Sequence, residues 1–135
     1  MLYRHTLIVL LLTLPTICGC GAKSVPGGTK GILLVGGAPM SELQINVHAT
    51  KDGTPQTIGF GVTAADGSFL LYQTGASSGL WLTPGEYRFT LESLGAPTVI
   101  PKEFTSAATT PWKVQWTGTE PTLNLELPAV EVKRK

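Results

Sequence analysis

The sequence predicts an all-β protein, a seven-stranded antiparallel sandwich of two sheets, and three observations lead to this fold class. In most stretches beyond residue 28, apolar residues recur at every second position, which is the period of a strand with one buried and one solvated face. The 135 residues include 16 glycines and 10 prolines spread along the chain, which favours frequent turns over disorder. No window spaces its apolar residues three and four apart, so we expect no amphipathic helix.

Residues 1–19 are predicted to be a secretory signal peptide. Arg4 supplies a positive charge, residues 7–14 (LIVLLLTL) are almost wholly apolar, and Pro15 ends the run. The run is well short of the about 20 residues that a membrane-spanning helix needs. A charged start, a short apolar middle and an exit of small residues are typical of a leader that is removed on export.

Both cysteines of the chain follow that run, in the stretch Ile17-Cys18-Gly19-Cys20. The stretch resembles the bacterial lipobox, and the resemblance implies that Cys20 is acylated as the mature N-terminus while Cys18 leaves with the leader. A disulfide between the two cysteines would close a small strained ring, and a metal site would need more ligands. A plain signal peptide would leave Cys20 as a free thiol in an oxidising compartment, which favours lipidation.

We therefore expect an exported protein of the cell envelope that is anchored to a membrane, on its periplasmic face or at the cell surface. Residues 20–29 are small and polar and are interrupted by Pro26. They predict a flexible tether with a reach of about 15–20 Å, which keeps the folded domain, residues 30–128, near the lipid. The tail, residues 129–135, ends in three basic residues and is expected to be a frayed, solvated terminus rather than a membrane-binding patch.

The strands of the domain follow from alternation, taken in chain order. They are predicted at residues 31–35, 44–50, 57–64, 68–74, 86–92, 112–117 and 122–127. Asp66-Gly67 is the strongest hairpin signal and joins the third strand to the fourth. A turn is expected at residues 51–55, and Gly59 and Gly61 predict a bend or bulge. The stretch 94–111 has no periodicity and is expected to be irregular.

The inner faces of these strands predict the core. Ile45, Val47 and Ala49 share one face of their strand, and Gln44, Asn46, His48 and Thr50 share the other. Large side chains are expected to fill the space between the sheets, namely Phe69, Tyr87, Phe89, Trp112 and Trp116. With no disulfide expected in the domain, packing has to hold it together.

Two motifs of this domain resemble those of the carboxypeptidase regulatory-like domain. They are VTAADGSFL at residues 62–70, with its T-x-x-DG-x-F pattern, and TPGEYRFTL at residues 83–91, with its PG-x-Y pattern. The resemblance covers most of residues 30–128 and implies a transthyretin-like (prealbumin-like) Greek-key sandwich. The motifs consist of turn and strand residues, so they are specific for the fold and say little about function. In carboxypeptidases this module is an accessory to the catalytic domain.

The sequence favours a protein that is not an enzyme, with no catalytic residue, cofactor or metal. His48 is the only histidine after the leader and is expected to be a solvated surface imidazole. Asp52 and Asp66 each precede a glycine, and turn formation explains both. No motif places a base beside a serine nucleophile. The formal net charge of +1 gives no electrostatic footprint for nucleic acid.

Binding is the more credible activity, and Trp81 is the one residue proposed to contact a ligand. It lies in a loop at one end of the sandwich, where it could stack on a sugar or on a partner protein. The competing interpretation is that it closes the end of the core, because tryptophan is mostly buried. We therefore expect a structural or protein-interaction module of the envelope, and alternatively a surface lipoprotein that binds cell-wall polysaccharide. Dimerisation through an edge strand stays open.

Overall fold

The computed structural model describes residues 27–96 and 98–129. Within these ranges the chain forms nine strands and one short 3-10 helix, η1 (Lys102–Thr105). The strands are β1 (Lys30–Val35), β2 (Ala38–Pro39), β3 (Leu43–Lys51), β4 (Thr54–Val62), β5 (Ser68–Leu70), β6 (Tyr72–Gln73), β7 (Gly85–Ser93), β8 (Lys113–Trp116) and β9 (Leu123–Leu127). The predicted all-β character is confirmed.

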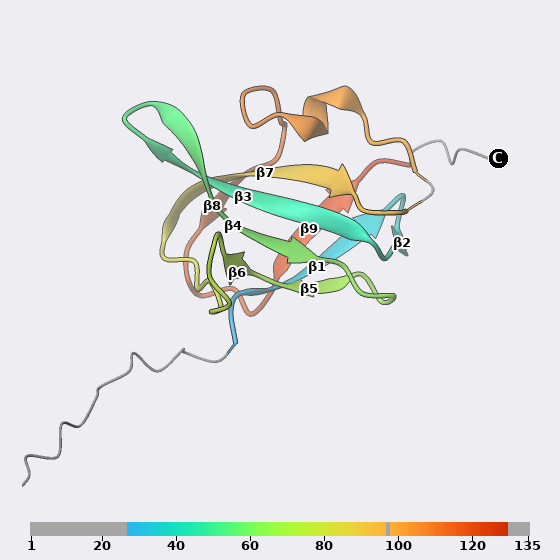
Figure 1. Ribbon diagram of the computed structural model, residues 1–135, viewed down its shortest axis with the longest axis horizontal. Helices are drawn as coiled ribbons and strands as arrows, with labels where there is room; N and C mark the ends of the chain where they lie inside the picture. Colours follow the sequence, from blue (N-terminus) through green and yellow to red (C-terminus); the bar gives the residue numbers. More distant parts are fainter. Residues whose placement is uncertain (1–26, 97, 130–135) are drawn as a thin grey trace, which may run out of the picture.

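The strands form two sheets (Figure 1). In the first sheet β9 pairs with one edge of β1, while β5 and β2 share the other edge by pairing with residues 30–32 and 34–35. The second sheet has the order β6-β4-β3-β7-β8, and all its neighbours are antiparallel. Both sheets contribute to one apolar core, which is the arrangement of a β-sandwich.

β9 runs parallel to β1, with Leu123 opposite Gly31, so the prediction of a purely antiparallel fold is wrong for this pair. The cause is the link from β8. Trp116 at the end of β8 lines the same surface hollow as Thr29 and Pro121. The link therefore returns the chain to the first sheet beside the start of β1, and β9 then has to run in the direction of β1.

The core contains the residues that alternation predicts. Fully or almost fully buried side chains from the second sheet include Ile45, Val47, Tyr87, Phe89 and Leu91, and those from the first include Leu33, Leu123, Leu125 and Leu127. Trp116 is also buried, whereas Trp112 is half-buried and packs edge-to-face on Phe104, with their ring centroids 4.8 Å apart. The predicted core role of the two tryptophans is confirmed fully only for Trp116.

The predicted strand 68–74 is divided between the two sheets. Ser68–Leu70 forms β5 and pairs with β1, and after the buried Leu71 the chain crosses to form β6, which pairs with β4. The Asp66-Gly67 turn therefore joins the sheets instead of closing a hairpin within one of them. The two-residue hairpin with this dipeptide lies at Asp52-Gly53, between β3 and β4.

A β-bulge confirms the irregularity that the glycines of β4 predict. The register between β3 and β4 shifts at Val47 and His48, which leaves Ile58 as the extra residue beside Gly59. A bulge of this kind bends the strand and increases its local twist.

The aperiodic stretch 94–111 covers part of β7. Phe104 of η1 is buried in the core, and Arg88 of β7 donates from Nη1 to the carbonyl of Ala107 at 3.0 Å. Thr110 donates to the carbonyl of Phe89 at 2.6 Å. The segment is thus fastened to the sheet by a buried ring and two hydrogen bonds.

Candidate functional site

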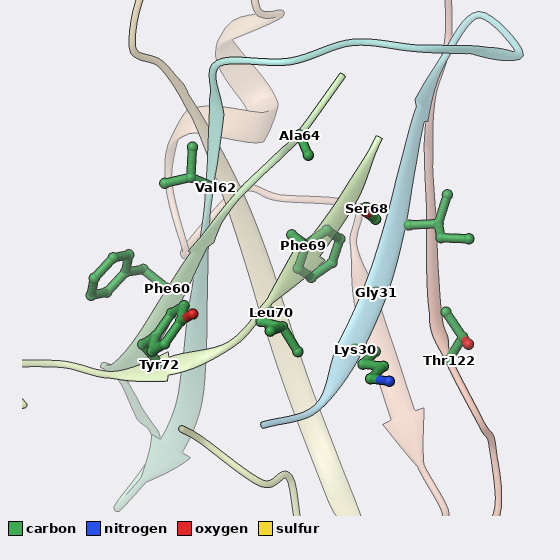
Figure 2. Close-up of a pocket in the computed structure, with 11 residues that line it drawn as sticks. Lys30, Gly31, Phe60, Val62, Ala64, Ser68, Phe69, Leu70, Tyr72 and Thr122 are labelled. Atoms are coloured by element: carbon green, nitrogen blue, oxygen red, sulfur yellow. The ribbon is translucent and has the colours of Figure 1, made fainter. Parts of the chain in front are cut away.

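An apolar groove lies over β5, at the seam between the two sheets. Its volume is about 540 Å³, within the usual range for ligand sites. The lining residues are Lys30, Gly31, Ile32, Phe60, Val62, Ala64, Ser68, Phe69, Leu70, Tyr72 and Thr122. Figure 2 shows Phe60, Val62 and Tyr72 on one side of β5, and Lys30 and Thr122 on the other. We call this surface the β5 groove.

Two glycines shape the floor of the β5 groove around Phe69. A Cβ atom on Gly31 would overlap with the ring of Phe69, and one on Gly61 would lie 3.0 Å from that ring and 2.7 Å from the carbonyl oxygen of Leu70. Phe69 is itself buried at 5% exposure. The ring of Phe69 therefore lies over Gly31 of its own sheet, and the close approach of β4 from the other sheet depends on the missing side chain of Gly61.

The walls of the β5 groove are apolar and exposed. Ile32, Val62 and Tyr72 are 39%, 42% and 38% exposed, and the rings of Phe60 and Tyr72 pack with centroids 6.2 Å apart. Among the residues that line the groove, Lys30 is the one charged side chain, and Ser68, Tyr72 and Thr122 supply hydroxyls. The groove is therefore suited to contact an apolar surface whose margin carries polar or anionic groups.

A second hollow, of about 330 Å³, contains Trp81. The indole is 55% exposed, so Trp81 does not close the core as the competing interpretation held. The neighbouring Leu82 is buried instead and its amide donates to Thr29 Oγ1 at 2.9 Å. Other residues of the hollow are Gly28, Lys30, Trp116, Gly118, Glu120 and Pro121. We call it the Trp81 hollow.

Charge in the Trp81 hollow is balanced. The pKa of Glu120 is lowered mainly by a hydrogen bond with the side chain of Thr117, so this carboxylate is ionised at neutral pH. Lys30 supplies the opposite charge and lines the β5 groove as well. The two hollows therefore adjoin at Lys30, the first residue of β1.

His48 is buried at 8% exposure, which corrects the prediction of a solvated surface imidazole. It lies on the outer face of β3 between strands β4 and β7. Its Nε2 is 2.8 Å from Thr90 Oγ1, and its Nδ1 is 3.0 Å from Thr57 Oγ1. Burial lowers the pKa of His48 below 6.5. With each ring nitrogen engaged by a hydroxyl, this side chain is placed for structure rather than for proton transfer.

The remaining polar candidates also have structural roles. Asp66 accepts hydrogen bonds from the hydroxyl and the amide of Ser68, and these lower the pKa of Asp66. Asp52 occupies the hairpin turn with φ of 52°. On the face that carries His48, Asn46 Nδ2 donates to Glu92 Oε2 at 3.0 Å. Among the described residues no three His, Cys, Asp or Glu side chains gather as metal ligands would.

Sequence reasoning singled out Trp81 but missed the β5 groove. A signal was present in β4, where Phe60 and Val62 alternate with Gly59 and Gly61. In the structure Phe60 and Val62 line the groove on the outer face of β4, whereas Gly59 and Gly61 are buried and Gly61 faces Phe69 of the other sheet. A strand that exposes apolar side chains to solvent indicates a candidate interaction surface.

Cys20, the predicted lipid attachment residue, lies outside the described residues, as do the leader and the tail from residue 130. No helix within 27–96 and 98–129 is long and apolar enough to cross a bilayer. Comparison with known proteins gave no similar family model, curated protein or solved structure.

Proposed function

We propose that this protein is an exported lipoprotein of the cell envelope whose β-sandwich acts without catalysis, as a structural or protein-interaction module. The observation that carries the proposal is the pair of adjoining surfaces at the start of β1. The β5 groove and the Trp81 hollow expose large apolar side chains beside the point where the tether would join the domain. Contiguous exposed apolar patches mark interaction sites in soluble domains.

We also infer that the sandwich is a Greek-key domain of the carboxypeptidase regulatory-like kind. The residues of its two motifs support this by their roles in the turns and core. Thr63 Oγ1 accepts from the amide of Leu43 at 3.1 Å, Gly67 has a φ of 79°, and Phe69 is buried. In the second motif, Tyr87 is buried and its hydroxyl donates to the carbonyl of Thr83 at 2.8 Å.

The anchor is tested by intact mass of the protein extracted from membranes. The expected mass is that of a chain starting at Cys20 plus acyl groups, and Cys20→Ser should lack the added lipid. A water-soluble protein with an unmodified N-terminus would contradict the proposal. Co-purification with the anchored protein, compared with a Tyr72→Ser variant, then shows whether the β5 groove holds a partner. A screen of generic ester, peptide and glycoside substrates is expected to stay at the blank rate.

A second candidate function is binding of cell-wall polysaccharide through Trp81. It is favoured by the 55% exposure of the indole above a hollow that also holds the carboxylate of Glu120. An array of polysaccharides tested by calorimetry should then show saturable binding that Trp81→Ala abolishes. Leu94→Ala is the matched control, because Leu94 is 56% exposed and lies outside both hollows. Absence of saturable binding across the array would exclude this function.

A further inference from the structure

We propose that the face formed by the β5 groove and the Trp81 hollow docks on the bilayer that carries the anchor. The inference rests on the lipid anchor of the proposed function and adds a second, non-covalent contact with the same membrane. In this arrangement the domain has a fixed orientation at the lipid surface instead of turning freely on its tether.

The first observation is the distribution of exposed apolar side chains. Large apolar residues of the described ranges that are well exposed are Ile32, Val62, Tyr72, Trp81, Leu94 and Val99. The first four line the two adjoining hollows, and the last two lie in the segment after β7. Four of the six exposed large apolar side chains thus gather at two adjoining hollows, and a contiguous patch of this kind marks an interface.

The second observation is how close this face lies to the anchor. The backbone of Gly27 packs on the indole of Trp81, since a Cβ atom there would lie 2.9 Å from Cζ2 of that ring. Cys20 is seven residues before Gly27. Even a fully extended chain of that length spans at most about 25 Å. An acyl group on Cys20 therefore holds the exposed side chains within reach of the lipid headgroups.

The chemistry of the face suits the interface of a bilayer. Tryptophan and tyrosine are enriched at the headgroup level, because their rings have an apolar body and a polar end. Lys30 lies between the hollows and can reach anionic headgroups. Because Glu120 offsets this charge in the Trp81 hollow, we expect docking that depends mainly on apolar contact and only weakly on salt.

Tethering makes a weak contact sufficient. A short link turns the second contact into an intramolecular event, with an effective concentration in the millimolar range. A face with four exposed apolar side chains therefore does not need the affinity of a free peripheral protein.

The test uses the membrane-extracted protein reconstituted into phosphatidylcholine vesicles whose acyl chains carry bromine, which quenches nearby tryptophan. Trp116 is buried, Trp112 is half-buried, and Trp81 is exposed. We expect quenching of the native protein, and loss of most of it in Trp81→Phe. Ile32→Ser with Tyr72→Ser should reduce quenching of Trp81 several-fold, while intact mass shows the same lipid on Cys20. Lys30→Glu is a second variant at an exposed position. It should lower the quenching of Trp81, and the decrease should be larger in vesicles that include phosphatidylglycerol than in phosphatidylcholine alone.

The matched control moves the reporter to the other end of the domain. Leu94 follows β7, whose nine residues (Gly85–Ser93) separate it from Trp81 by about 30 Å. In Trp81→Phe with Leu94→Trp, the new indole should stay unquenched. Equal quenching at both positions, or none at Trp81, would overturn the docking proposal. Saturable polysaccharide binding by an unquenched Trp81 would also overturn it.

The same preparations separate this proposal from the anchor itself. If intact mass shows no lipid on Cys20, the proposed function fails at its anchor. The docking proposal, which needs the tether, then fails with it. If intact mass shows lipid on Cys20 and Trp81 is unquenched, the anchor stands and docking alone is overturned.

Discussion

At the scale of single residues, the burial of a side chain depends more on the neighbouring strands than on its alternating position along its own strand. Alternation places His48 and Thr90 on the polar face of the second sheet, yet they are only 8% and 4% exposed. Each lies in a central strand with further strands on both sides, and each covers the other through a hydrogen bond. Phase predicts which sheet face a residue occupies, but how far that face is covered depends on pairing that one strand does not reveal.

The buried imidazole predicts that stability depends on pH. Burial lowers the pKa of His48 below its unfolded value of 6.5, so the unfolded chain binds the proton more readily. The contribution of neutral His48 to stability is complete above about pH 6.5 and is lost as the pH falls toward the folded pKa, by at most about 1.4 kcal/mol per pH unit. Urea unfolding between about pH 8 and pH 5 measures this loss. This window lies above the pH at which most Asp and Glu side chains titrate.

His48→Gln is the control for the pH effect, because the amide can still meet a hydroxyl but does not titrate in this range. We expect the free energy of unfolding of this variant to be flat over the same pH window. A slope equal to that of the native protein would show that another group is responsible.

Gly31 and Phe69 predict a compensating pair of substitutions. Gly31→Ala forces a methyl group into the ring of Phe69 and should cost about 1–3 kcal/mol by overpacking. Phe69→Leu makes room for it, so the double variant should be more stable than the sum of the single changes by about 0.5–3 kcal/mol. Denaturant titration of the four proteins measures the coupling. Strictly additive losses would mean that the ring does not rest on Gly31.

At the scale of elements, the strands were largely predictable from the sequence, but their partners were not. Residues 86–92 alternate cleanly and form β7, whereas residues 68–74 divide between two sheets at Leu71. The reason is that alternation defines a strand and its faces, while sheet membership depends on contacts with distant residues such as Gly31 and Gly61. Trp81 was identified because a loop aromatic stands out, and the β5 groove was missed because it forms only when β1, β4 and β5 meet.

The two Asp-Gly turns allow the cost of backbone strain to be separated from the cost of overpacking. Gly53 and Gly67 have nearly equal φ values of 77° and 79°. A Cβ on Gly53 meets nothing within 4 Å, whereas one on Gly67 would lie 2.5 Å from the carbonyl oxygen of Leu33. Gly53→Ala should therefore cost about 1–2 kcal/mol from backbone strain alone. Gly67→Ala should cost about 1–3 kcal/mol more, because a well-packed junction is overfilled.

Thermal or urea unfolding of the two alanine variants gives this difference directly. Equal losses would show that the turn between the sheets tolerates a side chain, contrary to its close packing on β1.

At the scale of the whole molecule, the first and last long strands are neighbours. All five residues of β9 pair with residues 31–35 of β1, so the two ends of the described domain are tied in one sheet. The sequence shows both strands but not this pairing, because either edge of β1 could accept an alternating partner. A fold with such distant pairing is expected to form slowly, since the loop between the partners must close first.

This pairing predicts that the domain does not fold without its last strand. A chain that ends after Thr122 loses Leu123, Leu125 and Leu127, which are at most 4% exposed. At about 1.5–3 kcal/mol for each buried side chain, the loss is comparable to the about 5–15 kcal/mol that stabilises a typical domain. It also leaves one edge of β1 unpaired. We expect no cooperative urea transition and a circular dichroism spectrum without the native β signal.

The control is a chain that ends after Ala129, which keeps all of β9 (Leu123–Leu127) and the contact of Ala129 with Gly36. It should unfold at the same urea concentration as the full chain. A cooperative transition in the chain that ends after Thr122 would mean that the second sheet, with β5 and β1, is stable alone. Because β1 contributes Lys30, Gly31 and Ile32 to the β5 groove, loss of the cooperative transition would mean that this groove does not form without β9.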